Sequence, residues 1–398
     1  MHALTIEDLR QRARRRVPRM FYDYVDAGSW TGATYRDNTD DFGALSFRQR
    51  VAIDIEHRST KTDLLGWPAA MPVAIAPTGL AGMLHADGEI HAARAARDFG
   101  IPFTLSTMSV CSIEDVAEAT DHHPFWFQLY FMRDRAFMER LLGRAAQAGC
   151  SALVLTLDLQ VQGQRHQDIR NGLSVPPRLG WRTAWDLVSH PRWCLQMLGT
   201  RRHRFGNIHG HVDGVDDLGS LSAWIAQQFD PGLDWSDIAW IKERWPGKLI
   251  LKGIMTAEDA ELAARAGADA LIVSNHGGRQ LDGALSSIAA LPAIVDAVGD
   301  RIEIHLDGGV RCGQDVLRAL ALGCQGVHIG RAMLYGLAAE GEAGVRRALE
   351  ILHQELQLTM GFCGRTAIGQ VDRSILAARH GFEAELPHAG PRGPLGHS

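Results

Sequence analysis

From residue 71 onward, short apolar runs alternate with stretches whose apolar residues recur at helical spacing. The apolar runs, which predict strands, span 72–76, 103–105, 126–129, 152–157, 249–251, 270–273, 302–306 and 326–329. The helical patterns span 88–99, 113–119, 135–148, 257–266 and 314–322. This alternation is typical of βα units around a parallel sheet. Eight repeats predict an α/β fold of the closed (β/α)8 barrel type.

Polar residues lie at the same place in nearly every repeat, at or just past the end of the predicted strand. They are Thr78, Ser106, Gln128 with Tyr130, Thr156 with Asp158, Lys252, Ser274 with His276, Asp307 and Arg331. Active sites of (β/α)8 barrels are built at this carboxyl end of the strands. An open doubly wound sheet would carry a G-x-G-x-x-G turn after its first strand, whereas residues 77–82 read PTGLAG. The pattern therefore favours the barrel.

Three segments lie outside the repeats, and we expect one domain over 1–378. Residues 1–65 read as a helical extension with a connector that could place Tyr22 and Tyr24 over the barrel mouth. Residues 159–235 form an insertion after the fourth strand that is far longer than a usual βα connection. Residues 379–398, rich in Gly, Pro and His, are expected to form a flexible tail.

Composition narrows the function classes. The chain has 398 residues, 46% of them hydrophobic, and a net charge of −5, so no global basic field recruits nucleic acid. The six cysteines show neither C-x-x-C pairs nor metal-ligand spacing, which favours reduced thiols in a cytoplasmic protein without a metal. The charged start lacks the apolar region of a secretory signal, and no apolar run is long enough to span a membrane.

The run SNHGGRQLD (274–282) places His276 and Arg279 just past a buried strand, joined by two glycines that allow a sharp turn. Imidazole, with an unperturbed pKa of about 6.5, suits proton abstraction near neutrality. Guanidinium grips a planar carboxylate through two parallel hydrogen bonds. The alternative is a satisfied loop histidine beside a solvated arginine. In the barrel context, the pair indicates chemistry on a small organic acid.

The last two strands predict a phosphate site. DGGVR (307–311) and Gly330-Arg331 supply backbone amides and two guanidinium groups where such barrels commonly bind phosphate. The polar residues that would surround a flat ligand attached to it are Thr78, Gly79, Ser106, Gln128, Thr156 and Lys252. A buried lysine needs a negative partner, which a reduced flavin ring offers. FMN is the favoured ligand, and a sugar phosphate is the rival.

With these motifs in order over residues 5–375, the chain resembles the FMN-dependent L-2-hydroxy-acid dehydrogenase and oxidase family. That family includes respiratory L-lactate dehydrogenase, glycolate oxidase and mandelate dehydrogenase. The SNHGGRQLD run is the most specific match, supported by YDY (22–24), APTG (76–79), TLST (104–107), FQLY (127–130), LKG (251–253) and IGR (329–331).

The resemblance implies a role for each matching residue. His276 would take a proton from the substrate, and Asp158 would orient the imidazole and stabilise its charged form. Arg165 and Arg279 would hold the substrate carboxylate, with Tyr24 and Tyr130 bonding the carboxylate and the hydroxyl. The implied FMN contacts are Pro77, Thr78, Gly79, Ser106, Gln128, Thr156, Lys252, Ser274, Asp307, Gly309, Arg311, Gly330 and Arg331.

The substrate side chain stays open at this stage. Met108 stands where glycolate oxidase carries a tryptophan, so the pocket should accept a side chain larger than hydrogen, unless Met108 is core filler. Gln162, in a polar segment after Asp158, could bond a polar or aromatic substituent. L-lactate is the favoured substrate, and a mandelate-like or longer acid is the alternative.

Within the insertion, residues 178–204 interleave tryptophans with arginines, which suits the headgroup region of an anionic bilayer. A loop packed on the barrel or on a neighbouring subunit is the other interpretation. Membrane contact at the inner face of the cell membrane would fit a quinone as electron acceptor.

An oxidase that uses O2 and yields H2O2, a non-redox isomerase barrel and a non-catalytic binding protein are the competing functions. The resemblance also implies a homotetramer.

Overall fold

The computed structural model describes residues 2–172, 180–211, 224 and 227–378. Eight parallel strands form one sheet in the order β4-β11-β10-β9-β8-β7-β6-β5. A parallel bridge between Ile75 and Phe103 joins β4 to β5, so the sheet closes into the predicted (β/α)8 barrel. The strands are β4 (Val73–Ile75), β5 (Thr104–Ser106), β6 (Trp126–Tyr130), β7 (Ala152–Thr156), β8 (Lys248–Ile254), β9 (Ala270–Val273), β10 (Glu303–Asp307) and β11 (Gly326–Ile329).

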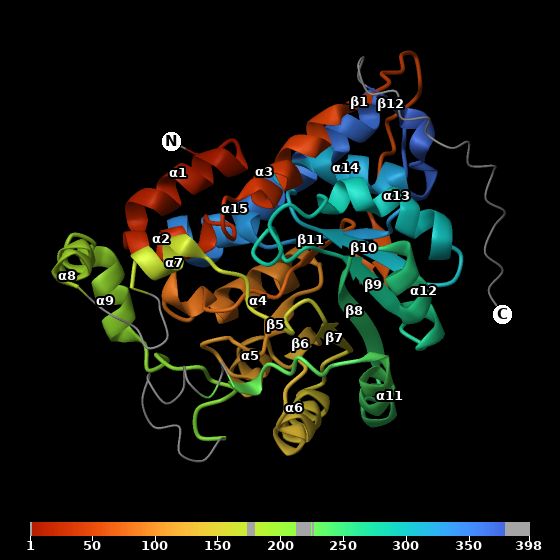
Figure 1. The fold of residues 1–398 in the computed structure, drawn as a ribbon. Coiled ribbons are helices and arrows are strands. Elements are labelled where there is room, and N and C mark those ends of the chain that lie inside the picture. Colours follow the sequence, from red (N-terminus) through yellow and green to blue (C-terminus); the bar gives the residue numbers. More distant parts are fainter. Residues whose placement is uncertain (1, 173–179, 212–223, 225–226, 379–398) are drawn as a thin grey trace.

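The helices surround the barrel (Figure 1). The predicted ones are α4 (Gly88–Phe99), α5 (Ile113–Ala119), α6 (Arg135–Gln147), α12 (Ala257–Arg265) and α14 (Gly313–Leu322). The sequence pattern missed α13 (Ser287–Val298), which contains Pro292, and α15 (Arg331–Phe362), which is kinked at Glu340 and Gly341. Pro292 and the glycines of α15 are weak helix formers, and burial on the barrel outweighs that preference.

The N-terminal segment contributes α1 (Ile6–Arg16), α2 (Arg19–Val25), α3 (Ala33–Asp40) and β1 (Leu45–Phe47). Helix α1 packs on α15 and α4, and β1 pairs antiparallel with β12 (Leu376–Ala378). The tail at 379–398 lies outside the described residues. A hairpin of β2 (Thr62–Leu64) and β3 (Trp67–Ala69) follows the connector and adds its fully buried Leu64 to the barrel interior. The hairpin therefore closes the amino end of the barrel.

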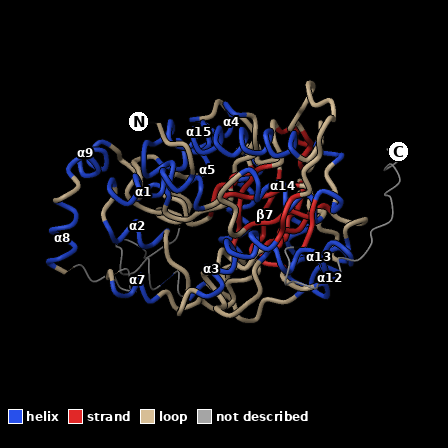
Figure 2. The backbone as a smooth tube through the Cα atoms, turned by 90° about the horizontal axis from the view of Figure 1, so that it is seen from above, coloured by secondary structure: helices blue, strands red, loops and turns tan. Residues whose placement is uncertain are grey.

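The described parts of the insertion hold α7 (His166–Arg170), α8 (Trp181–Val188) and α9 (Pro191–Gly199), and α11 (Trp235–Arg244) begins where the insertion ends. Figures 1 and 2 both place α8 and α9 at the margin of the molecule, away from the strands. Helix α7 instead contacts α2. The N-terminal segment and the start of the insertion therefore meet, whereas α8 and α9 project outward.

Candidate active site

His276 and Asp158 form a bonded pair at the carboxyl end of the barrel. His276 follows β9, Asp158 follows β7, and His276 Nδ1 lies 2.9 Å from Asp158 Oδ1. His276 has a φ of +58°, a strained conformation for a residue with a side chain, and such strain is often kept at functional sites. Burial lowers the pKa of His276, and the Asp158 charge only partly opposes this. The neutral imidazole therefore donates Nδ1–H to Asp158 and keeps a lone pair on Nε2.

Asp158 stays ionised at neutral pH. Burial alone would raise the pKa of Asp158, but the charges of His276 and Lys252 and the His276 hydrogen bond together lower it. Its backbone carbonyl accepts a hydrogen bond from the side-chain amide of Gln280, 2.7 Å away. Gln280 thus ties the loop after β9 to the loop after β7. The hydrogen bond from His276 Nδ1–H to Asp158 fixes the tautomer of His276, and the negative charge of Asp158 stabilises a proton added at Nε2.

Two guanidinium groups flank the ring of Tyr24, which comes from α2. The Arg279 and Arg165 guanidinium carbons lie 4.6 and 5.4 Å from the ring centroid. Arg279 donates to the Tyr24 carbonyl, yet its buried Nη2 has no partner among the described residues. Burial, and then the like charge of Arg165, lower the pKa of Arg279 to about 10. Arg165 pairs with Asp168 at 3.0 Å. Arg279 therefore offers an unused donor inside the site.

Tyr130 lies close enough to Asp158, Arg165 and Arg279 for their charges to act on its hydroxyl. Burial raises its pKa, and the charges of Asp158, Arg165 and Arg279 all act on the Tyr130 hydroxyl. A Cβ added to Gly79 would lie 3.3 Å from the half-buried Met108 and 3.8 Å from Tyr24 Oη. The fold thus brings together the predicted residues of the loops after β4, β5, β7 and β9, Tyr130 at the end of β6, and Tyr24 of α2. Tyr22 is buried, and its hydroxyl donates to Asp26.

Phe229, at the end of the insertion, meets Tyr130 edge-on with ring centroids 5.7 Å apart. Sequence reasoning missed it because nothing in its neighbourhood signals that residue 229 returns to the strand ends. With Leu159 and Leu233 it also lines a narrow gap that has no room for a water molecule. The only available signal was its place just before the fifth predicted strand, where an insertion must return to the barrel.

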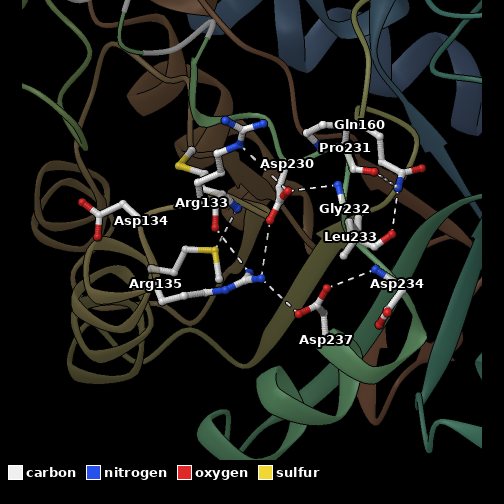
Figure 3. Close-up of polar contacts among 12 residues, drawn as sticks. Arg133, Asp134, Arg135, Gln160, Asp230, Pro231, Gly232, Leu233, Asp234 and Asp237 are labelled. Carbon is white, nitrogen blue, oxygen red and sulfur yellow. Dashed lines mark hydrogen bonds and ion pairs between the residues drawn. The ribbon is translucent and has the colours of Figure 1, made fainter.

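A polar cluster fixes this return (Figure 3). Arg135 bonds Asp237 at 3.0 Å and Asp230 at 3.6 Å, and Asp230 also accepts from the Gly232 N–H. The Gln160 amide donates to the Leu233 carbonyl at 2.8 Å. The cluster holds the end of the insertion against α6 and the loop after β7. Phe229 is therefore held beside Tyr130 by a bonded frame.

Inside the mouth, hydrogen bonds link neighbouring strands. Ser106 donates to the side-chain Oε1 of Gln128, and the Gln128 side-chain amide donates to Thr156, both at 3.0 Å. Lys252 Nζ donates to Ser274 at 2.7 Å and pairs with Asp307 at 3.2 Å.

The side chains of Lys252 and Asp307 are buried, and one oxygen of Asp307 has no hydrogen-bond partner among the described residues. Burial lowers the pKa of Lys252, but Asp307 and Asp158 outweigh it and raise the pKa overall. Asp307 Oδ1 is buried without a partner among the described residues. A buried polar atom without a partner is costly, so this end of the barrel is suited to a polar ligand.

The predicted phosphate residues lie after β10 and β11. Arg331 is half-buried and donates to the carbonyls of Val25, Ala27 and Gly277 at 2.7–2.9 Å. Among the described residues neither Arg331 nor Arg311 pairs with a carboxylate. Burial lowers the pKa of Arg331, so an anion nearby would stabilise its charge.

Among the other predicted FMN contacts, Gly330, Pro77 and Thr78 lie near the start of α15, whereas Gly309 packs against α3. Gly330 precedes the first turn of α15, whose N–H groups suit an anion, and a Cβ on it would lie 3.7 Å from Thr78. Pro77 and Thr78 are half-buried beside it. Gly309 has a φ of +86°, and a Cβ there would overlap the Asn38 carbonyl of α3. Gly309 is thus required by packing against α3.

In the segment 178–204, the structure separates anchoring from exposed residues; Arg178 lies outside the described residues. Trp193 stacks on Phe21 and donates to the Met83 carbonyl, and Arg202 pairs with Asp87 and Asp115. The exposed apolar side chains are Trp181, Trp185, Val188, Leu195 and Leu198, each 69–81% exposed. The two helices α8 and α9 thus present an apolar surface while Trp193 and Arg202 fasten them to the body.

Comparisons with known proteins agree with this geometry. The family model for FMN-dependent dehydrogenases matches residues 13–378. An L-lactate dehydrogenase of Caulobacter vibrioides is 45% identical over 96% of this chain and 98% of its own length. The crystal structure of a monotopic membrane protein, (S)-mandelate dehydrogenase, superposes with a TM-score of 0.91 at 36% identity, covering 95% and 100% of the two chains. A mandelate oxidase gives a TM-score of 0.81 at 34% identity, covering 95% and 99%. No described helix is long and apolar enough to cross a membrane.

Proposed function

Because the chain belongs to the family of FMN-dependent dehydrogenases and oxidises 2-hydroxy acids, we propose that it converts L-lactate to the 2-oxo acid with His276 as the base. The observation that carries the proposal is the convergence at one site of a neutral His276–Asp158 pair and the unused donor of Arg279. We further propose that the electrons pass to a quinone.

The residues at the mouth fit FMN. Lys252 and the unpartnered Asp307 Oδ1 offer a charged donor and an acceptor to the polar edge of a flavin. Ser106, Gln128 and Thr156 add hydroxyl and amide groups at the same level. Arg311, Arg331 and the start of α15 would hold the phosphate. The contacts that we propose are Pro77, Thr78, Gly79, Ser106, Gln128, Thr156, Lys252, Ser274, Asp307, Gly309, Arg311, Gly330 and Arg331. When bound, FMN would accept the electron pair of the broken carbon–hydrogen bond together with its hydrogen.

The protein supplies proton transfer and orientation. Arg165 and Arg279 hold the substrate carboxylate, with Tyr24 between them, and the Tyr130 hydroxyl bonds the substrate hydroxyl. His276 Nε2 takes the hydroxyl proton, and Asp158 stabilises the imidazolium that results. The positive charges of Arg279 and Lys252 oppose protonation of His276 before substrate arrives. A substrate carboxylate offsets them and makes His276 a stronger base.

Met108 and Phe229 support a small apolar substrate side chain. Met108 lies beside Gly79 and Tyr24, and Phe229 closes on Tyr130. Both would contact the substituent at the carbon that bears the hydroxyl. A mandelate-type substrate is the second candidate, favoured by the structural similarity to the mandelate enzymes.

The choice of substrate is tested by anaerobic bleaching of bound FMN with L-lactate, glycolate, L-mandelate and longer acids. L-lactate should give the highest ratio of reduction rate to half-saturating concentration. Absence of bleaching by every acid in the panel would contradict the proposal.

The acceptor is tested by reoxidation. After anaerobic reduction by L-lactate, a soluble quinone should reoxidise the enzyme much faster than air does. Fast reoxidation by air, with formation of H2O2, would identify the oxidase alternative instead.

We propose peripheral membrane contact through residues 178–204 at the inner face of the membrane, supported by the exposed apolar surface of α8 and α9 and by the monotopic neighbour. Trp185→Ser with Leu198→Ser should abolish sedimentation with anionic vesicles, whereas Val51→Ser, an equally exposed site elsewhere, should not. If the double variant still sediments, membrane contact through α8 and α9 is wrong.

A homotetramer is also proposed, and light scattering of the purified protein tests it.

A further inference from the structure

Two histidines and a glutamate form a hydrogen-bonded chain inside the barrel. Glu303 and His305 lie on β10, and His328 lies on the neighbouring β11. His305 Nε2 is 2.7 Å from Glu303 Oε1, and His305 Nδ1 is 2.9 Å from His328 Nε2. Both imidazoles are almost completely buried. We refer to Glu303, His305 and His328 as the histidine relay; the proposed reaction at the mouth does not use it.

The relay has a defined direction. Glu303 also accepts the Leu65 N–H, as expected of an ionised carboxylate. An ionised Glu303 accepts the His305 Nε2–H, so His305 Nδ1 must accept from His328 Nε2–H. This leaves His328 Nδ1 as a lone pair, and it is buried without a partner among the described residues. The relay therefore ends in an acceptor that can take one proton.

Charged groups face this acceptor from two strands. Asp307 is the ladder partner of His328, and its Oδ1 also lacks a partner among the described residues. Lys252 on β8 pairs with Asp307 at 3.2 Å, and its charge lowers the pKa of His328, after burial and His305. The other strands contribute side chains that do not titrate at this level, such as Ala74, Trp126, Val154, Ile250 and Ile272.

The relay spans the barrel. Glu303 stands at the amino end, where its side chain is 22% exposed and meets the β2–β3 hairpin. Asp307 and Lys252 stand at the carboxyl end among the groups that fit FMN. A proton that binds His328 Nδ1 can therefore be passed along the relay without a side chain having to move far, because the His328 Nε2–H shifts to His305 Nδ1 and the His305 Nε2–H shifts to Glu303 Oε1.

We propose that the histidine relay binds one proton from solvent when FMN receives two electrons, and releases it when they leave. Two electrons place negative charge next to Lys252, which weakens the repulsion that keeps His328 neutral. The proton comes from water at the mouth and forms an N–H on His328 Nδ1, at the level of Asp307. The two shifts along the hydrogen bonds then convert the Glu303 carboxylate to a carboxyl group and leave both imidazoles neutral. No electron enters the relay. His305 and His328 are thus positioning residues that act through Lys252 and Asp307.

The proposal rests on FMN binding beside Lys252 and not on the role of His276. The test is therefore electrochemical and needs no substrate. The midpoint potential of the FMN-loaded enzyme is measured by spectroelectrochemistry between pH 6 and 8, and its slope gives the protons bound per two electrons. The wild-type slope should exceed the slope of His328→Phe, which keeps an aromatic ring of similar size, by one proton per two electrons.

Two further variants make the result decisive. Glu303→Gln at the barrel edge removes the carboxylate that accepts the shifted proton, and it should also lower the slope by one proton even if His328→Phe fails to load FMN. Ile272→Val, a packing change at the ladder partner of His305, should keep the wild-type slope. A slope in either relay variant equal to that of the wild type would overturn the proposal. Loss of substrate bleaching with these slopes intact would instead count against the proposed function alone.

Discussion

The two ends of the barrel differ in how they treat buried charge. At the carboxyl end, Asp158 Oδ2, Arg279 Nη2 and Asp307 Oδ1 are buried without partners among the described residues, and His276 has a strained backbone. At the amino end, Leu64 fills the barrel interior and Glu303 accepts from both Leu65 and His305. Unmet hydrogen bonds cost stability unless a ligand supplies partners. The carboxyl end is therefore built for ligands, and the amino end is built for stability.

The sharpest way to break this contrast is to replace the proposed base. His276→Gln should keep bound FMN but slow anaerobic reduction by L-lactate by about 10²–10⁴-fold, the usual contribution of a general base. Stopped-flow absorbance of the flavin band measures the rate. His57→Gln on an exposed loop is the control. Reduction within threefold of the wild-type rate would remove His276 from this role.

The next largest effect should come from the carboxylate clamp. Arg279→Lys keeps the charge but loses the planar fork, so a charge-assisted hydrogen bond worth about 1.5–3 kcal/mol is lost and kcat/KM should fall about 10–100-fold. Steady-state assays with a soluble quinone measure it, with the exposed Arg265→Lys as the control. An unchanged kcat/KM would show that the unused Nη2 donor serves another purpose.

The pH profile sharpens the electrostatic side of the comparison. Burial lowers the pKa of His276 below 6.5, and the base must be neutral to accept a proton. The second-order rate constant for flavin reduction should therefore rise with pH on the acid side and level off above about pH 6.5. In Asp158→Asn, which removes the charge that raises the pKa of His276, the acid limb should move to lower pH and the plateau should fall. A rate that declines from pH 5 to pH 7 would contradict a histidine base.

Sequence patterns predicted the strands and the mouth residues because both follow local rules. Each barrel strand is a short apolar run, and parallel strands bring their carboxyl ends together whatever the loops do. His276, Asp158 and Lys252 could be placed in this way. Phe229 and the histidine relay could not, because their meaning depends on which distant segments meet. His305 and His328 sit singly in apolar strands, and only the ladder register brings them within 2.9 Å.

The smallest effect on catalysis is expected at the amino end. Leu64→Ala removes a fully buried side chain that fills the barrel interior, so the free energy of unfolding should fall by about 2–5 kcal/mol. The rate of flavin reduction should stay within twofold of the wild-type rate, because Leu64 touches none of the mouth residues that act on substrate. Chemical denaturation of the apoprotein and stopped-flow reduction of the loaded enzyme measure the two quantities, with the exposed Leu4→Ala as the control. A large loss of rate with little loss of stability would mean that packing at the amino end sets the geometry of the mouth, and the contrast between the two ends would fail.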